Sequence, residues 1–190
     1  MNHKPTIMLF MAFFCCFAAA CATGGPEKES QTQALKAEEA AAVQKKQELS
    51  EEERLKSLIK EAEAAGREDE KLARDLINLA DVYKPKGRFF EAEELYKRAI
   101  SVLEKDKGPE SLEVAEVCDM LAELYIRQGK YSLAKPYRKR SLDIYEKAYG
   151  PKDARLLPAL ENYIAVLKKL NFSNQVAILK ARVRFIKAHE

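Results

Sequence analysis

Apolar residues recur with a helical period through the middle of the chain. Four of them fall at i, i+3, i+4 and i+7, on one helix face: Leu76, Leu79, Ala80 and Tyr83. Gly87 follows, where a left-handed residue can end the helix. Six more residues mark the face of a second helix: Ala92, Leu95, Tyr96, Ala99, Ile100 and Leu103. The turn signal Gly108-Pro109 comes next, so we expect a helical hairpin over about residues 72–112.

The same pattern returns 42 residues further along. The repeated positions are Leu79 and Leu121, Ala80 and Ala122, Tyr83 and Tyr125, Gly87 and Gly129, Ala92 and Ala134, Glu104 and Glu146, and Gly108-Pro109 and Gly150-Pro151. A third copy is degenerate, and its helix faces are kept by Leu160, Tyr163, Ile164, Leu167, Val176, Leu179, Val183 and Ile186. Asn171 stands there for the turn glycine, a role asparagine can fill in left-handed geometry. A fixed period of this length is typical of stacked helix pairs.

The two regular copies resemble a known repeat family. The segments LADVYKPKGRFFEAEELYKRAISVLEKDKGP and LAELYIRQGKYSLAKPYRKRSLDIYEKAYGP are similar to the tetratricopeptide repeat, in the 42-residue form of kinesin light chains and related bacterial proteins. The resemblance covers about residues 72–190. It implies an all-α fold: a right-handed superhelical array of antiparallel helix pairs, with repeats at about 72–112, 113–154 and 155–190. An unrelated array of helical hairpins would share most of this pattern.

Two further features concern helix starts. Ser50-Glu51-Glu52-Glu53 fits a capping box. We therefore expect an N-terminal cap helix over residues 50–66, in the second-helix slot of a preceding unit, with Leu55, Leu58 and Ile59 packed on the first full pair. Pro136 is expected in the first turn of its helix, where proline is tolerated.

The N-terminus predicts export. Lys4 precedes an uninterrupted apolar run from Ile7 to Ala20, which is short for a bilayer span. The run ends in Ala18-Ala19-Ala20 and is followed by Cys21, and these four residues resemble a bacterial lipobox. The resemblance implies a signal peptide at 1–20, a lipidated Cys21 and a flexible tether over 21–49. A plain signal-peptidase cut after Ala20 is the alternative. By analogy with Gram-negative sorting, Ala22 favours an anchor in the outer membrane that faces the periplasm.

Composition argues against several functional classes. Charged residues make up 33% of the chain and nearly balance at a net charge of +3, which gives no support to a nucleic-acid partner. The histidines are His3 and His189 alone, and no phosphate loop or metal-ligand cluster appears. We therefore expect no enzyme, cofactor or metal site. Cys118 occupies the position of Leu76 in the first copy, so a buried small hydrophobe is favoured over a reactive thiol.

Repeat arrays of this kind bind ligands on a concave surface made mainly of first helices. The positions that face this groove in related proteins correspond here to Arg74, Ile77, Asn78, Asp81, Lys84, Glu116, Asp119, Met120, Glu123, Arg127, Glu161, Asn162, Ala165 and Lys168. Asn78 and Asn162 match a groove asparagine of the light-chain form, whose amide can bond both the N–H and the C=O of an extended peptide. The alternative is that both are solvated polar residues. The acidic positions favour a polar or basic segment over a C-terminal carboxylate.

The last copy changes character. Ile100 becomes Leu142 and then Arg184, so the array is expected to end with this chain. Ile178 and Phe185 share a face that is polar in the earlier copies, and form either an exposed contact or part of the helix's own core.

Two functions remain in view. The first is a membrane-anchored adaptor that holds a protein or peptide segment in its groove within an envelope assembly. The alternative is a structural or chaperone-like subunit of a pilus, secretion or outer-membrane assembly complex, docking by its convex face or ends. The identity of the partner and the oligomeric state stay open.

Overall fold

The computed structural model describes residues 50–189. The predicted signal peptide (1–20), the lipidation site Cys21 and the tether (21–49) lie outside the described residues.

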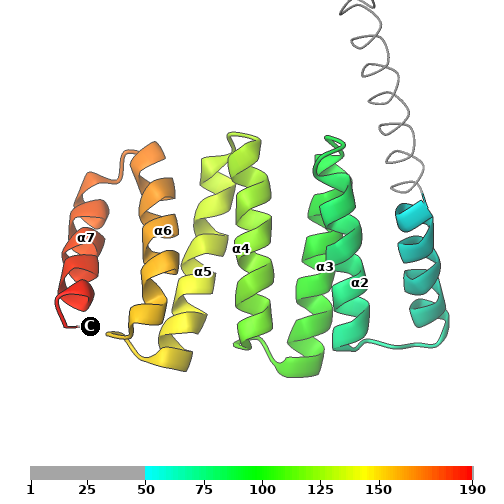
Figure 1. Cartoon of the computed structure of the whole chain (residues 1–190). Helices are drawn as coiled ribbons and strands as arrows, with labels where there is room; N and C mark the ends of the chain where they lie inside the picture. The colour runs from blue at the N-terminus through cyan, green and yellow to red at the C-terminus, as the bar shows by residue number, and fades with distance from the viewer. Residues whose placement is uncertain (1–49, 190) are drawn as a thin grey trace, which may run out of the picture. The chain divides into compact units, whose positions relative to one another are not determined.

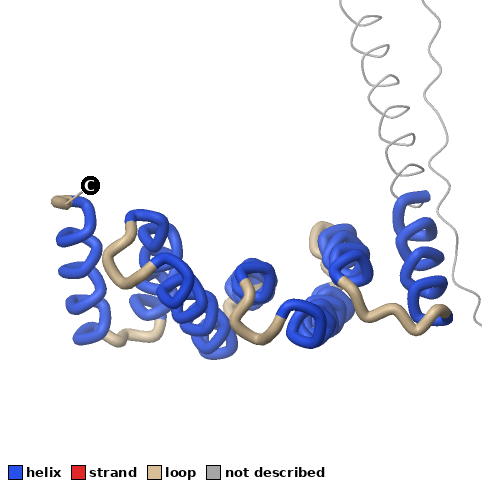
Figure 2. The backbone as a smooth tube through the Cα atoms, turned by 90° about the horizontal axis from the view of Figure 1, so that it is seen from below, coloured by secondary structure: helices blue, strands red, loops and turns tan. Residues whose placement is uncertain are grey.

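Every described element is a helix joined to the next by a short loop (Figures 1 and 2). Residues 50–64 are helical, and six α-helices and one 3₁₀ turn follow: α2 (Glu70–Tyr83), α3 (Phe89–Lys107), α4 (Leu112–Arg127), α5 (Tyr131–Tyr149), η1 (Ala154–Leu156), α6 (Leu157–Lys169) and α7 (Ser173–Lys187). They pair as α2–α3, α4–α5 and α6–α7. In Figure 2, α4 is seen almost end-on and α7 from the side, so the helix axes turn along the array. The predicted all-α superhelical array is confirmed.

First and second helices of each pair begin differently. A side-chain carboxylate or hydroxyl caps the N-terminus of the first helix in each of the first two pairs. Asp69 accepts from the Leu72 N–H of α2 at 2.9 Å, and Ser111 accepts from the Val114 N–H of α4 at 3.3 Å. The second helices start directly from the tight turn and have no such cap. In the third pair Asp153 caps η1, a 3₁₀ turn ahead of α6 that the sequence pattern did not indicate.

The turns inside the pairs use left-handed backbone. Gly87 has φ of 71° and Gly129 has φ of 72°. Asn171 takes the same place with φ of 61°, and no other non-glycine residue that the structure describes has a positive φ. The substitution of asparagine for the turn glycine is therefore confirmed.

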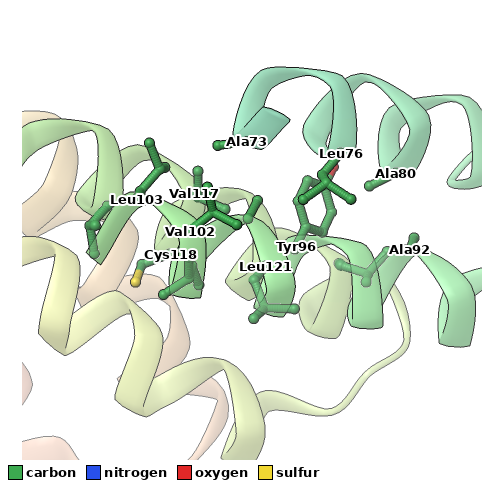
Figure 3. Packing of buried hydrophobic residues seen from close by; sticks show 14 of the residues in the cluster. Ala73, Leu76, Ala80, Ala92, Tyr96, Val102, Leu103, Val117, Cys118 and Leu121 are labelled. Atoms are coloured by element: carbon green, nitrogen blue, oxygen red, sulfur yellow. The ribbon is translucent and has the colours of Figure 1, made fainter. Parts of the chain in front are cut away.

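The core runs along the array between the helices of each pair and between neighbouring pairs. Figure 3 shows Ala73, Leu76 and Ala80 of α2 against side chains of α3 and α4. The alanines that recur at equivalent positions of the two regular copies are fully buried: Ala80, Ala92, Ala122 and Ala134. Because they carry only a methyl group, the helix backbones can lie close together. Cys118 is buried among these residues, and burial raises the pKa of its thiol to about 11, as expected for a packing residue.

Residues 50–64 occupy the second-helix slot ahead of α2, as predicted. Leu55 and Ile59 are buried in the shared core, and Leu58 is half-buried. The capping-box interpretation was wrong, because Ser50 is itself helical and so does not cap. The third residue of that motif has another role: Glu52 is buried and ion-paired with Lys86 at 3.0 Å and Arg88 at 2.9 Å, across to the α2–α3 turn.

The position of Pro136 also differs from the prediction. α5 begins at Tyr131, so the proline lies inside the helix rather than in its first turn. Proline removes the hydrogen bond to the carbonyl four residues earlier, that of Ser132. Ser132 is exposed, so water can satisfy that carbonyl and the helix continues to Tyr149.

Candidate ligand groove

Each first helix leaves one stripe of side chains unburied. On α2 the stripe contains Arg74, Asn78 and Asp81, which are exposed, and Ile77, which is half-buried. The equivalent stripe on α4 holds Glu116, Asp119, Met120, Glu123 and Arg127, and that on α6 holds Glu161, Asn162, Ala165 and Lys168, all exposed or half-buried. The predicted groove positions are thus on the accessible face of the three first helices.

The stripes of α2 and α4 meet over a pocket of 210 Å³. Apolar side chains form its floor: Ala73, Ile77, Leu103, Val117 and Met120. Charged side chains form its walls: Glu70, Arg74, Glu113 and Glu116. The structure thus brings four predicted groove positions together in one pocket: Arg74, Ile77, Glu116 and Met120.

Within this pocket the charges do not balance. Glu70 is already paired, with Arg74 at 2.9 Å and with Lys107 at 2.9 Å. Glu113 and Glu116 form no ion pair with any residue that the structure describes, and Glu116 is exposed. Lys107 also interacts electrostatically with Glu113, so Glu70, Glu113 and Glu116 face two cations, Arg74 and Lys107, and the pocket keeps an excess of one negative charge over its apolar lining.

The carboxylate of Asp81 is bound by two side chains of its own helix pair. The Tyr96 hydroxyl on α3 donates to its carboxylate at 2.5 Å, and the Lys84 ammonium lies 2.5 Å from it. Burial, together with the bond to Asp81, raises the pKa of Tyr96 well above its usual value, so the phenol stays a donor. Asp81 therefore presents a fixed and partly neutralised carboxylate rather than a free one.

Asp119 and Glu123 are engaged in the same way one repeat later. Arg138, which replaces Tyr96 at the equivalent position, is buried and reaches Asp119 at 2.7 Å and Glu123 at 3.4 Å. Arg127 also pairs with Glu123, at 3.5 Å. Because these two carboxylates neutralise a buried arginine, they contribute less charge to a ligand than the sequence suggested.

The third pair has no such clamp. The equivalents of Asp119, Glu123 and Arg138 are Glu161, Ala165 and Lys180; alanine carries no charge, and Lys180 forms no ion pair with a residue that the structure describes. Asn162 is exposed on α6, and Glu161 pairs with Lys187 at 2.9 Å. Lys168 lines two separate pockets of 380 and 330 Å³ between α6 and α7. Asn162 and Lys168 are accessible, but they do not line the pocket over α2 and α4.

The sequence interpretation missed Glu113, Tyr96 and Arg138. Tyr96 and Arg138 could have been found, because each lies 15 residues after an acidic groove position in its own repeat. Glu113 had no comparable signal, since it lies in the first turn of α4 and only the packing of α2 against α4 brings it to the pocket.

On the opposite, convex side, ion pairs between neighbouring helix pairs recur with the 42-residue repeat. An arginine of each second helix pairs with a glutamate from the previous one: Arg98 with Glu63, Arg140 with Glu104, and Arg182 with Glu146. A lysine of α3 and of α5 instead pairs with a glutamate of the loop that precedes its own helix pair: Lys105 with Glu68 before α2, and Lys147 with Glu110 before α4. Much of the convex charge is therefore used to join neighbouring pairs.

Ile178 and Phe185 on α7 are exposed, at 69% and 43%. The alternative in which they tuck into the helix's own core is excluded, because Val176 and Ile186 fill that core. Phe185 stacks on His189 with ring centroids 4.2 Å apart, and the Lys152 ammonium lies 5.5 Å from its ring.

Metal centres and membrane-spanning helices are two further features to be considered for residues 50–189. No cluster of three or more potential metal ligands occurs among them. None of the helices described there has both the length and the apolar character to cross a bilayer.

Known proteins share this architecture. Residues 71–147 match the family model described as the tetratricopeptide repeat. The solved structure of BtubC (BKLC) from P. vanneervenii is 22% identical with a TM-score of 0.55, over 63% of this chain and 47% of that one. TPR-like repeats assigned to a kinesin light chain of Podosopora anserina are 19% identical with a TM-score of 0.60, over 73% and 66%. This chain thus spans about half of the first relative and just under two thirds of the second, and the likeness concerns the fold. No curated protein matches the sequence at a significant level.

Proposed function

We propose that this chain, whose residues 71–147 match the tetratricopeptide-repeat model and whose fold resembles that of kinesin-light-chain-like repeats, is an adaptor that binds an extended segment of another protein in the groove over α2 and α4. The observation that carries the proposal is the pocket with an apolar floor and two unpaired carboxylates, Glu113 and Glu116. A lysine or arginine of the ligand would meet the carboxylates, and a neighbouring apolar side chain would cover Ile77 and Met120. The segment is therefore basic and apolar in character.

Asn78 supplies the backbone contact in this proposal. It is exposed on the α2 stripe between Arg74 and Asp81, and its amide can pair with both polar groups of a peptide unit. Asn162 offers the same chemistry on α6. A long ligand would engage both, while a short one would engage only Asn78.

The groove is favoured over the convex face because of where the free charge lies. Convex arginines and lysines are paired with glutamates of the preceding unit, whereas the groove acids Glu113 and Glu116 have no described partner. Charges that are already paired add little to a second contact, while unpaired charges add to both affinity and association rate.

Membrane anchorage through Cys21 is part of the proposal. The short apolar run followed by Ala18-Ala19-Ala20-Cys21 supports a bacterial lipoprotein, with the repeat array tethered by residues 21–49 in the cell envelope. Growth with labelled palmitate should mark the wild type and leave Cys21→Ser unlabelled. Label that survives this substitution would refute the anchor while leaving the groove proposal intact.

The groove is tested by capture from detergent-solubilised envelopes. Asn78→Ala with Asn162→Ala should weaken capture of the partner at an unchanged melting temperature, because both side chains are exposed. The matched control is Asn174→Ala, an exposed asparagine on α7 outside the stripes. Equal capture by all variants would contradict the groove.

One observation supports the second candidate, a structural subunit that docks by its end. Ile178, at 69% exposure, is a large apolar side chain on a face that holds Glu94 and Pro136 in the earlier pairs. In that case capture would depend on Ile178 and not on Asn78.

A further inference from the structure

One edge of the array collects the turns that join the two helices of each pair. Because the helices alternate in direction, the α2–α3, α4–α5 and α6–α7 turns lie at the same end, at the top of Figure 1. The helix of residues 50–64 runs like a second helix, so residue 50 also lies at this end. We call it the turn edge. Three of the five exposed large apolar side chains of the described residues occur there: Phe90, Leu133 and Phe172.

Between the second and third pairs, these side chains are interleaved with lysines. The Lys135 ammonium lies 4.0 Å from the centre of the Phe172 ring, and the Lys169 ammonium lies 5.9 Å from that of Tyr131. The cations thus cross the junction in both directions. We define the turn-edge patch as Lys130, Tyr131, Leu133, Lys135, Lys169 and Phe172.

The patch is free of negative charge. Residues 124–142 and 162–189 contain no aspartate or glutamate. None of the three lysines forms an ion pair with a residue of the described range; Glu93 of α3 interacts electrostatically with Lys130 at longer range, and its ion pair, at 2.6 Å, is with Lys97. The first pair differs, because the positions of Leu133 and Lys135 are held there by Glu91 and Glu93. Three unpaired cations therefore concentrate on the C-terminal half of the edge.

The form of the patch indicates which anionic partner it fits. Leu133 is 48% exposed and Phe172 39% exposed, and both stand at helix ends next to turns. A peptide is normally held in a groove, whereas a lipid surface accepts protruding apolar side chains with lysines that extend toward the headgroups. Unpaired lysines near such a surface are attracted by anionic lipids.

We propose that the turn-edge patch docks the array on an anionic lipid surface. Residue 50, the point at which any membrane-bound N-terminal segment would be joined to the array, lies at the same edge. Docking would hold the helix axes steeply to the membrane and leave the groove over α2 and α4 open at the side. The inference is separate from the peptide groove, and it requires neither the partner nor lipidation of Cys21.

The sequence contains no tryptophan, so a single introduced tryptophan reports its own surroundings. Leu133→Trp and Phe172→Trp place this probe in the patch. Ala148→Trp places it at an exposed site near the end of α5, at the opposite edge. Full-length chains are mixed with vesicles of brominated phosphatidylcholine and phosphatidylglycerol, and the bromine quenches tryptophan that enters the acyl region. Because the readout belongs to one side chain, the affinity of the N-terminal segment for the vesicle does not produce it.

We expect quenching of Leu133→Trp and Phe172→Trp to exceed that of Ala148→Trp several-fold. Reversing Lys130, Lys135 and Lys169 to glutamate in the Leu133→Trp chain should lower it to the level of Ala148→Trp, at an unchanged melting temperature. Vesicles of brominated phosphatidylcholine alone should also give the lower value. Equal quenching at the two edges would overturn the proposal, and so would quenching that survives charge reversal.

Discussion

The guanidinium of Arg140 on α5 lies 2.5 Å from the carboxylate of Glu104 near the end of α3, and it also donates to the Pro109 carbonyl at 3.1 Å. The same arrangement recurs 42 residues later, where Arg182 of α7 pairs with Glu146 and donates to the Pro151 carbonyl at 2.7 Å. Each of these arginines thus joins its own second helix to the previous second helix and to the loop that follows that previous helix.

This tie gives a stability prediction. Arg140→Ala should lower the free energy of unfolding by about 0.5–1 kcal/mol, a modest value because the pair is about one-third exposed and screened by water. Lys139→Ala, whose partner Asp143 lies within the same helix, is the control and should cost less. The effect of Arg140→Ala should shrink in high salt. Denaturant unfolding of both variants at two salt concentrations checks this.

The small residues between paired helices give a second prediction. Ala80→Leu or Ala122→Leu should each cost about 1–3 kcal/mol, because both sites are fully buried and have no room for three more carbon atoms. Ala181→Leu, at an exposed position of α7, should be nearly neutral. Unchanged thermal melting of both buried variants would contradict the helix register described above.

The docking of residues 50–64 should depend on pH. Hydrogen bonds from Lys56, and then from Lys86 and Arg88, lower the pKa of Glu52 from 4.5 to about 2 although burial opposes the shift. A lowered pKa in the folded state stabilises the fold above pH 4.5, and this contribution is lost as the pH falls toward 2. Glu52→Gln should therefore destabilise the protein by about 1–3 kcal/mol at neutral pH.

The matching control is Glu53→Gln, because Glu53 is exposed and forms no described ion pair. The difference between the two variants should vanish as the pH approaches 2. A gap that stays constant from neutral pH down to pH 2 would show that the charge of Glu52 does not stabilise the fold.

Substitution of Ile178 and Phe185 on α7 tests whether these side chains form a contact surface or part of the core. Ile178→Asp with Phe185→Asp should change the free energy of unfolding by less than about 1 kcal/mol, because neither side chain is buried. A loss of several kcal/mol would place these residues in the core after all. If the pair joins two copies or a partner, sedimentation should show the loss of that association at the same melting temperature.

The fold could be predicted in detail because the information is local and repeated. The spacing of Leu76, Leu79 and Tyr83 defines a helix face, and its return after 42 residues predicts stacking. Asn171 could be recognised as a turn residue only because the repeat aligned it with Gly87 and Gly129. The predicted first-turn position of Pro136 was wrong, because the repeat pattern does not mark the helix start and α5 begins five residues earlier, at Tyr131.

The site could be predicted only in part. The repeat register placed Asp81, Asp119 and Glu123 on the accessible face, and that is where they lie. The register also places Tyr96 and Arg138 15 residues after Asp81 and Glu123, so these contacts were open to prediction, but only the structure shows that each side chain reaches its carboxylate. The carboxylates left for a ligand are therefore Glu113 and Glu116, three residues apart on α4, and only the packing of the helices shows that they line a pocket with α2 residues.

The central claim is that the groove over α2 and α4 prefers basic and apolar segments, and selection from a random peptide library on the immobilised full chain measures this preference directly. We expect the wild type to enrich peptides in which lysine or arginine stands beside an apolar residue. Glu113→Lys with Glu116→Lys should abolish this preference or shift it toward acidic peptides, while Glu53→Lys with Glu61→Lys, two exposed acids of residues 50–64, should leave it unchanged. Enrichment that is the same in all three proteins would contradict the account.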